Sequence, residues 1–333
     1  MIFFRVGVWA GTLLTLLTVC PVARGQLTRL NVSYTGESPT QLPAFIAKET
    51  GIFAKNGLDV QLVRTTSTVS VMGLLSGDLA ILQVAGPAVI SSALKGADAV
   101  FVAGGAVTLD YWFMSAKAIK TPEQLKNGTV GSSDLSGASF IASQFAIRKL
   151  GLNPIKEVAI IRAGGTSERL VGLRTGRLQA TLLSPPTSFI AQREGFNLLT
   201  DVAGLPFQHN GVATTRKFIR DKPDVVRRYV KSQVEAVHVL KSDRETSIKV
   251  IAKYLKLKDR ELLERSYDVS SGEDVYPRKQ YPTLAGIKTI LDALAAENSK
   301  AKEVKPEDFV DLTFIKELDE SGFTANLYQD KGR

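Results

Sequence analysis

The stretch Gly73-Leu-Leu-Ser-Gly77-Asp-Leu79-Ala80 returns 99 residues later as Gly172-Leu-Arg-Thr-Gly176-Arg-Leu178-Gln179. At the same displacement, Pro87 falls on Pro186. Each copy is typical of a helix ended by glycine, a short apolar strand, and a proline at the first turn of the next helix. Because the turn residues keep their register over this length, the sequence predicts two half-molecules of like topology.

Outside the repeat, short runs rich in β-branched and aliphatic residues alternate with helix-period runs. Alternation of this kind predicts an α/β protein in which doubly wound, mainly parallel sheets carry helices on both faces. The loops that follow the strands lie at the carboxyl edge of such a sheet, where ligands bind. In the first half the predicted strands are Leu30–Tyr34, Leu58–Arg64, Leu79–Val84 and Ala99–Ala103.

After a last strand near Phe196–Val202, the pattern favours helices alone, which we expect to form a cap on the first lobe. The chain must then cross between the lobes twice, near Thr108–Met114 and near Pro206–Arg216, and two crossovers make a hinge. We therefore expect lobe 1 to contain residues 26–110 and 211–333, and lobe 2 residues 111–210. The predicted cap helices are Pro223–Lys241, Arg244–Leu255, Asp259–Tyr267, Leu284–Glu297 and Pro306–Asp319.

The N-terminus has the layout of a secretory signal peptide: Arg5 precedes an apolar run, and Ala23-Arg-Gly25 offers a small-residue cleavage site. We predict cleavage after Gly25 and export to the periplasm. The apolar run is shorter than the roughly 20 residues that span a bilayer, so a permanent membrane anchor is the weaker alternative. Lipidation of Cys20 is a further alternative, disfavoured by Val19 before it and Pro21 after it.

The composition is close to that of an average globular protein, with 333 residues, 44% of them apolar and 23% charged. Two histidines and a single cysteine leave no ligand set for zinc, haem or an iron–sulfur cluster. The sequence therefore predicts no metal site and no cofactor. The formal net charge of +9 mildly favours anionic ligands, but the Lys and Arg residues are scattered, so no nucleic-acid partner is expected.

The run from Tyr34 to Val60 contains Ala47-Lys-Glu-Thr-Gly51-Ile-Phe53-Ala-Lys-Asn-Gly57-Leu-Asp59-Val60. Together with the repeated glycine segments, it resembles the nitrate/sulfonate/taurine/thiamine-precursor (SsuA-like) family of substrate-binding proteins. The resemblance implies a two-lobed periplasmic-binding-protein (type II) fold that closes on a small ligand. It also implies that the protein delivers this ligand to an ABC permease and ATPase complex in the inner membrane. We expect the protein to be a monomer and the ligand to be anionic or heteroaromatic.

Candidate ligand contacts come from loops at the expected cleft edge, where helix starts and short hydroxyl side chains meet bound anions. Each Ser or Thr could instead be an ordinary helix N-cap, and Gly164-Gly165-Thr166 could be a tight turn. The aromatic pair at the first crossover could stack on a ligand or belong to the interlobe core. The candidates are Tyr34, Glu37, Ser38, Ser67, Gln83, Gly86, Tyr111, Trp112, Ser133, Ser136, Gly164, Gly165, Thr166 and Ser184.

Two other functions stay open at this point. An exported enzyme on the same fold could use Glu37 and Asp110 as a carboxylate pair, although the chain has no nucleophile elbow and no metalloprotease motif. A sensory module would need a membrane partner to signal, since no kinase-like or DNA-binding extension is visible. The sequence itself favours neither over capture of a solute.

Overall fold

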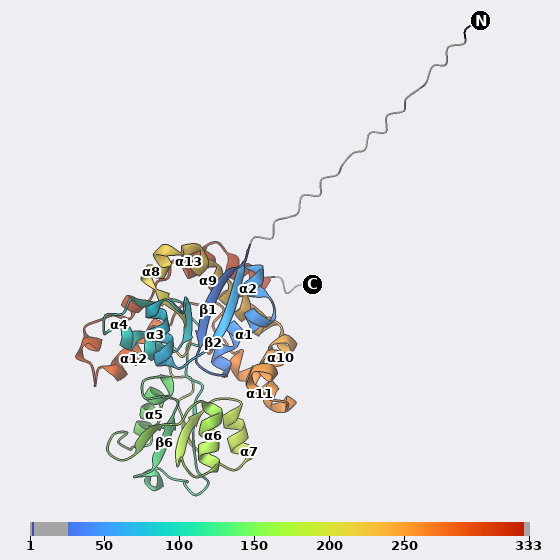
Figure 1. Ribbon diagram of the computed structural model, residues 1–333. Coiled ribbons are helices and arrows are strands. Elements are labelled where there is room, and N and C mark those ends of the chain that lie inside the picture. The colour runs from blue at the N-terminus through green and yellow to red at the C-terminus, as the bar shows by residue number, and fades with distance from the viewer. Residues whose placement is uncertain (1, 3–25, 330–333) are drawn as a thin grey trace.

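Two lobes lie one above the other in the computed structural model, which describes residue 2 and residues 26–329 (Figure 1). Apart from residue 2, the predicted signal peptide and its cleavage site lie outside the described residues. Each lobe is built on one five-stranded sheet. The prediction of an α/β protein with two mainly parallel sheets is confirmed.

The sheet of lobe 1 has the order β2-β1-β3-β10-β4. Strands β1 to β3 run parallel, whereas β10 is antiparallel to both of its neighbours. The alternation of buried and exposed residues in β1 places one face of this strand against the core. The strands are β1 (Thr28–Tyr34), β2 (Leu58–Arg64), β3 (Ile81–Val84), β4 (Ala99–Ala103) and β10 (Gly211–Thr215).

The sheet of lobe 2 has the equivalent order β7-β6-β8-β5-β9, and β5 is the antiparallel strand. In both sheets the antiparallel strand is the first one that the chain forms after it crosses over. The expectation of helices alone after residue 202 is therefore wrong, because the second crossover leads directly into β10. The strands are β5 (Trp112–Ser115), β6 (Thr129–Ser132), β7 (Ala159–Arg162), β8 (Ala180–Leu183) and β9 (Asn197–Asp201).

The repeat read from the sequence is also the structural repeat. Helices α3 (Ser67–Ser76) and α6 (Thr166–Arg174) are both followed by a left-handed glycine, Gly77 at φ +87° and Gly176 at φ +73°. The remaining helices of the two repeats are α1 (Leu42–Glu49), α2 (Ile52–Lys55), α4 (Gly86–Ala93), α5 (Ala138–Lys149) and α7 (Thr187–Arg193), with 3-10 turns η1 (Pro39–Gln41) and η2 (Glu123–Leu125).

The C-terminal helices pack on lobe 1, where the buried valines of α9 join the core formed with α1 (Figure 1). One predicted helix, Pro306–Asp319, is wrong: Val310 forms a bridge to Phe101 of β4, which separates two shorter elements. The two shorter elements are η4 (Pro306–Phe309) and α13 (Thr313–Glu320). The other elements of the C-terminal region are α8 (Arg216–Asp221), α9 (Pro223–Ser242), α10 (Arg244–Leu255), α11 (Arg260–Ser270), α12 (Leu284–Leu294), η3 (Ser299–Lys302) and α14 (Phe323–Gln329).

The two crossovers pair with each other as an antiparallel ribbon between the lobes. The amide of Leu109 donates to the carbonyl of Leu205 (3.1 Å), and that of Phe207 donates to Val107 (2.9 Å). Gly105 is required for this close approach, because a Cβ there would lie 2.7 Å from the carbonyl oxygen of Asn210. The hinge is thus a narrow, hydrogen-bonded joint.

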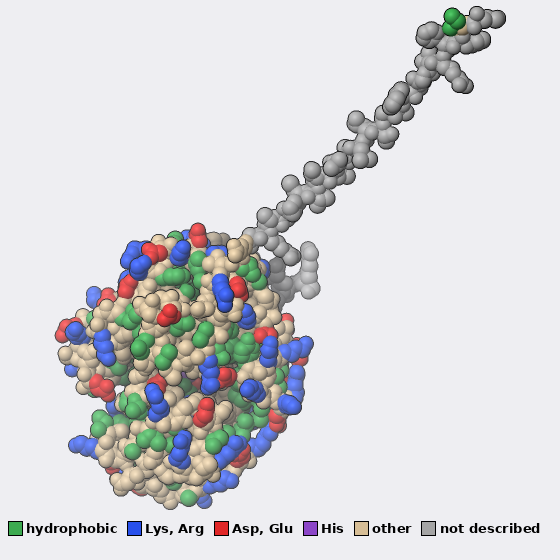
Figure 2. Space-filling view, viewed as in Figure 1, with side chains coloured by type: hydrophobic (Ala, Val, Ile, Leu, Met, Phe, Trp, Pro, Cys, Tyr) green, Lys and Arg blue, Asp and Glu red, His purple; other side chains and the backbone are tan. Residues whose placement is uncertain are grey.

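Within the described residues, no helix is long and apolar enough to cross a membrane. On the face shown in Figure 2, basic and acidic side chains are interspersed over both lobes. This face carries no large patch of a single charge sign that would attract a charged ligand. We therefore expect ligand-binding charges to lie in the cleft.

Candidate functional site

A cavity of about 420 Å³ lies between the two lobes. Its walls are the loops that follow β1 and β2 in lobe 1 and those that follow β6 and β7 in lobe 2, with residues of both crossovers between them. The strand-end loops therefore face each other across this cavity. The volume is within the range of sites that hold small organic ligands.

The wall from lobe 1 is rigid because η1 is anchored from two sides. Ser38 caps this turn by accepting from the amide of Thr40, and Tyr276 donates to the carbonyl of Pro39 (3.2 Å). Asn210 of the hinge donates to the carbonyl of Thr40. Gln41, only 3% exposed, is held beside the cavity, with its Oε1 atom unpartnered among the described residues.

The wall from lobe 2 is formed by the starts of two helices, α5 and α6. Their N-cap residues, Gly137 and Gly165, have no side chains with which to cap the first turn. The amides of such a turn lack partners within the helix and favour an anion. At α5, the carboxylate of Asp134 accepts from the amides of Ser136 (3.0 Å) and Gly137, so a negative charge already lies at this helix start.

Helix α6 instead presents a buried arginine in its first turns. Arg169 lines the cavity and is only 1% exposed, yet no carboxylate lies within ion-pair distance of it among the described residues. Its Nε and Nη2 atoms make long contacts of 3.4 Å with Gly165 and Thr166, and Nη1 has no described partner. Burial lowers the pKa of the guanidinium, but arginine stays protonated in proteins. A buried, unpaired cation of this kind calls for an anionic partner.

The hinge contributes an aromatic and titratable group between the two walls. The ring of Tyr111 packs edge-on against His209 (centroids 4.9 Å apart) and lies 5.9 Å from the Arg169 guanidinium. Burial raises the pKa of Tyr111 to about 12 and lowers the pKa of His209. Behind them, burial raises the pKa of Asp110, whose Oδ1 lies 3.6 Å from Nδ1 of His209.

At the cavity wall, Arg64 joins the two lobes. It is paired with Glu37 of its own lobe (3.2 Å) and with Glu168 of α6 (3.7 Å). All three side chains are between a third and a little over half exposed, so water screens these pairs. Because Arg64 is satisfied by two carboxylates, Arg169 is the cavity's arginine whose charge is not matched.

The model of the NMT1-like family matches residues 26–256, about two thirds of the chain. This chain belongs to the NMT1-like family. Among proteins with curated descriptions, none matches it significantly.

Solved structures with a similar fold are widespread. A protein from Bordetella bronchiseptica RB50 is 19% identical, with a TM-score of 0.76, covering 89% of this chain and 98% of that one. The alkanesulfonate-binding protein SsuA from Xanthomonas axonopodis pv. citri, bound to MOPS, is 16% identical, with a TM-score of 0.70 and coverages of 86% and 99%. The nitrate-binding protein NrtA from Synechocystis PCC 6803 is 13% identical, with a TM-score of 0.70 and coverages of 92% and 91%. These likenesses establish the periplasmic-binding-protein fold.

In this NMT1-like protein, eight of the fourteen candidate residues line the interlobe cavity. They come from four strand-end loops and the first crossover, as the facing-loop arrangement requires. One of them, Ser133, is held by a 2.6 Å contact between its hydroxyl and that of Ser139. The eight are Glu37, Ser38, Ser67, Tyr111, Ser133, Gly164, Gly165 and Thr166.

Three of the other six candidates are taken up by packing. Trp112 packs edge-on against Phe189 (5.1 Å) within lobe 2, so it is turned to the core. Tyr34 packs edge-on against Phe45 (5.2 Å). Gly86 allows helix α4 to approach α12, because a Cβ there would lie 2.4 Å from Ile290.

The last three candidates do not line the cavity, and each takes part in hydrogen bonds within the protein. Gln83 is fully buried and donates to Tyr229 (3.1 Å) and Gln233 (3.0 Å). Ser136 bonds through its amide to Asp134, and the carbonyl of Ser184 accepts from the Thr187 hydroxyl (2.7 Å) at the start of α7. The two acids considered for catalysis are also apart in role: Glu37 lines the cavity, whereas Asp110 is packed behind His209.

Several polar residues of the cavity were not among the candidates, including Gln41, Arg64, Arg169 and His209. The sequence feature that these four residues share is their place in the chain: each lies at, or a few residues from, a strand end or a crossover. In the sequence Arg169 looks like one of many scattered basic residues. Only its burial distinguishes it, and burial depends on how the lobes meet.

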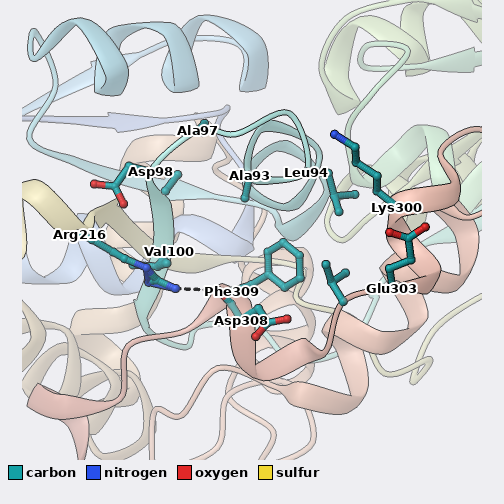
Figure 3. A pocket seen from close by; sticks show the side chains of 12 residues that line it. Ala93, Leu94, Ala97, Asp98, Val100, Arg216, Lys300, Glu303, Asp308 and Phe309 are labelled. Carbon is teal, nitrogen blue, oxygen red and sulfur yellow. Dashed lines mark hydrogen bonds between the residues drawn. The ribbon is translucent and has the colours of Figure 1, made fainter.

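A second cavity of about 300 Å³ lies within lobe 1, between the end of α4, β4 and the turns η3 and η4 (Figure 3). Its arginine, Arg216, donates to the carbonyl of Asp308 (2.8 Å) and is therefore occupied. Among the described residues, no group of three His, Cys, Asp or Glu side chains could hold a metal ion. The interlobe cavity is the stronger candidate site.

Proposed function

We propose that this protein is the solute-binding component of an ABC import system, which captures a small anionic molecule between its lobes and delivers it to a membrane permease. The observation that carries the proposal is Arg169, a buried guanidinium that lines the interlobe cavity. Among the described residues, one of its nitrogens has no hydrogen-bond partner and no carboxylate lies within ion-pair distance. Removing a charge from water is costly unless an opposite charge is supplied. An anionic group of the ligand supplies it.

The family and the fold support this reading. Similar structures include proteins described as alkanesulfonate-binding, as nitrate-binding and as the ligand-binding component of an ABC-type import system. The facing loops and the ribbon hinge suit a mechanism of closure: a ligand that touches both lobes binds the closed state better than the open one and shifts the population toward it.

The cellular setting follows from the same proposal. The precursor is exported with its first 25 residues as a signal peptide, is cleaved after Gly25, and works in the periplasm as a monomer that requires no cofactor. N-terminal sequencing of the protein from a periplasmic extract should begin at Gln26. A chain that keeps residues 1–25 in the membrane fraction would contradict this part of the proposal.

Capture is tested by native mass spectrometry of protein purified without refolding, followed by thermal-shift titration with small sulfonates, carboxylates, nitrate and phosphate. At a ligand concentration of 100 Kd, stabilisation of about 2.7 kcal/mol is expected. Small-angle scattering should show compaction with the same concentration dependence. A protein that retains nothing and is stabilised by no anion would refute capture of an anionic solute.

Delivery is tested separately, in vesicles that contain an ABC permease and ATPase encoded alongside this protein. Ligand-loaded protein should stimulate ATP hydrolysis and uptake, and ligand-free protein should stimulate them less. Capture without any effect on a permease, together with co-purification with a membrane kinase, would favour a sensory module.

A further inference from the structure

Two polar atoms on the side of the cavity formed by lobe 1 and the hinge are hydrogen-bond acceptors for which no partner is found among the described residues, and the first of them is a buried atom. The first is Oε1 of Gln41, whose Nε2 is used in a contact with the Thr35 hydroxyl (3.4 Å). The second is Nε2 of His209. Nδ1 of that ring lies 3.2 Å from the carbonyl oxygen of Thr108, which can only accept, so Nδ1 carries the proton and Nε2 has a free lone pair.

These acceptors belong to one joint of the structure. Asn210 donates to the carbonyl of Thr40, and this bond ties the hinge to η1. Asn210 is the sequence neighbour of His209, and Thr40 is the sequence neighbour of Gln41. His209 is 5% exposed and Gln41 is 3% exposed, and both line the cavity. Rigid positions of this kind preorganise the two acceptors for a ligand.

The electrostatic surroundings of this joint differ from those of α6. The nearest charged group to His209 is the buried carboxyl of Asp110, with Oδ1 3.6 Å from Nδ1 and otherwise unpartnered among the described residues. Burial lowers the pKa of His209, which keeps the imidazole neutral and its Nε2 an acceptor. The cavity therefore offers acceptors at one wall and the unpaired Arg169 guanidinium at the other.

We propose that the ligand carries, besides its anionic group, an N–H or O–H donor that binds Oε1 of Gln41, with Nε2 of His209 as a second acceptor for a group that carries more than one hydrogen. This inference rests on the proposed function, since it assumes that Arg169 holds the anion. A ligand with both groups bridges lobe 2 to lobe 1 and the hinge. An anion without the donor would leave a buried amide oxygen unpaired, which disfavours its binding.

The test compares matched probes that differ only in the group far from the anion. One set is 4-aminobenzenesulfonate, 4-hydroxybenzenesulfonate and 4-methylbenzenesulfonate; a shorter set is 2-aminoethanesulfonate, 2-hydroxyethanesulfonate and propane-1-sulfonate. Isothermal titration should show that, in the set whose length fits, the amino or hydroxyl member binds about 10- to 100-fold more tightly than the methyl member.

Variants then test whether the preference for amino or hydroxyl probes depends on Gln41. Gln41→Met removes the acceptor at similar size and should reduce the preference at least several-fold. Thr35→Val breaks only the other contact of the same amide and should keep the preference. Arg169→Met should weaken all members of a set alike, because it removes the site for their common sulfonate.

The outcomes separate the two proposals. Tight binding of the methyl members, or equal binding within both sets, would overturn the donor requirement and leave capture of an anion intact. Loss of the preference in Thr35→Val but not in Gln41→Met would overturn the assignment to Gln41. Binding of no sulfonate in either set would count against the proposed function and would overturn the donor requirement with it.

Discussion

Helices α3 and α6 hold equivalent places in the two halves, but their first turns are satisfied in different ways. The 99-residue displacement sets Thr66 against Gly165 and Ser70 against Arg169. In α3 the Thr66 side chain caps the helix, and the Ser70 hydroxyl bonds to that of Thr65 (2.6 Å). In α6 the cap is a glycine, and Arg169 keeps one nitrogen without a described partner.

The difference shows that the same strand–loop–helix unit can complete the cavity wall in one lobe and leave polar groups available to a ligand in the other. Both halves bring a helix start to the cleft, because the repeat fixes strand, loop and helix in the same order. In lobe 1 the side chains of that start bond to each other and complete the wall. In lobe 2 the start is left incomplete, and the proposed anion site lies there. The donor site proposed at Gln41 gives lobe 1 its own, separate part in binding.

The largest expected effect comes from Arg169→Met, which makes α6 as uncharged as α3 at this position. Affinity for a sulfonate ligand should fall by about 100-fold or more, since a buried charge partner is lost. The free energy of unfolding of the ligand-free protein should be unchanged or raised by up to about 3 kcal/mol, because a buried unpaired charge is replaced by an apolar chain. Titration calorimetry and urea denaturation measure the two quantities.

Ser70→Ala is the matched control in the other half. It removes one hydroxyl contact of a satisfied turn, so ligand affinity should change by less than about tenfold, the equivalent of one ordinary hydrogen bond. If Ser70→Ala weakened binding as much as Arg169→Met, the contrast between the two helix starts would be refuted. A large loss of stability in Arg169→Met would instead indicate that the arginine is a structural residue.

The repeated glycine and proline positions were sufficient to predict the α/β halves, because turns with left-handed glycines are set by local backbone conformation. Strands β5 and β10 could not be predicted in the same way. Each is short, and each completes a sheet through antiparallel pairing with strands far away in the sequence. Such strands are determined by their partners more than by their own residues.

The site was predictable at the level of loops and less so at the level of side chains. Hydroxyl and glycine residues after strand ends, such as Ser67 and Thr166, reach the cavity because parallel strands bring their loops to one edge. Trp112 does not, because a strand alternates its faces and the face of Trp112 meets Phe189. Arg169 and His209 become distinctive only through burial, which depends on contact between the lobes.

The next prediction concerns His209 of the hinge, which lies outside both helix starts, and the pH dependence of stability. Burial holds the pKa of His209 below 6.5, so below pH 6.5 the unfolded chain binds a proton that the folded protein refuses. Stability is therefore lost as pH falls below 6.5, by at most about 1.4 kcal/mol per pH unit from this group. His209→Gln should flatten the decline in thermal-unfolding temperature over that range.

Asp110→Asn is a second variant for the same experiment, because the buried Asp110 and His209 side chains change the stability in opposite directions as pH falls. Burial raises the pKa of Asp110, so its contribution is present at low pH and is lost as pH rises above 3.8. Without this carboxyl, and without its attraction for a protonated His209, acidification should destabilise the protein more steeply. A profile unchanged by either substitution would show that the hinge does not control the acid response.

The smallest expected effect concerns a contact outside the cavity that joins lobe 2 to the C-terminal cap. Arg193 of α7 pairs with Asp259 (2.7 Å) and Glu261 (3.3 Å), and Arg265 of α11 lies 4.1 Å from the centroid of the Phe189 ring. We expect widening of the cleft to separate α7 from α11, so these contacts should favour the closed state. Arg193→Ala should weaken ligand binding by no more than about fivefold, because exposed ion pairs are worth little.

The matched control is Arg174→Ala, which breaks an ion pair with Glu194 inside lobe 2 and should leave closure unchanged. At about 1 M salt the difference between Arg193→Ala and the wild type should disappear, since charges are then screened within about 3 Å. If Arg174→Ala weakened binding as much, lobe 2 itself would be perturbed. If Arg193→Ala weakened it as much as Arg169→Met, affinity would depend on holding the lobes together, and the contrast between α3 and α6 would not decide binding.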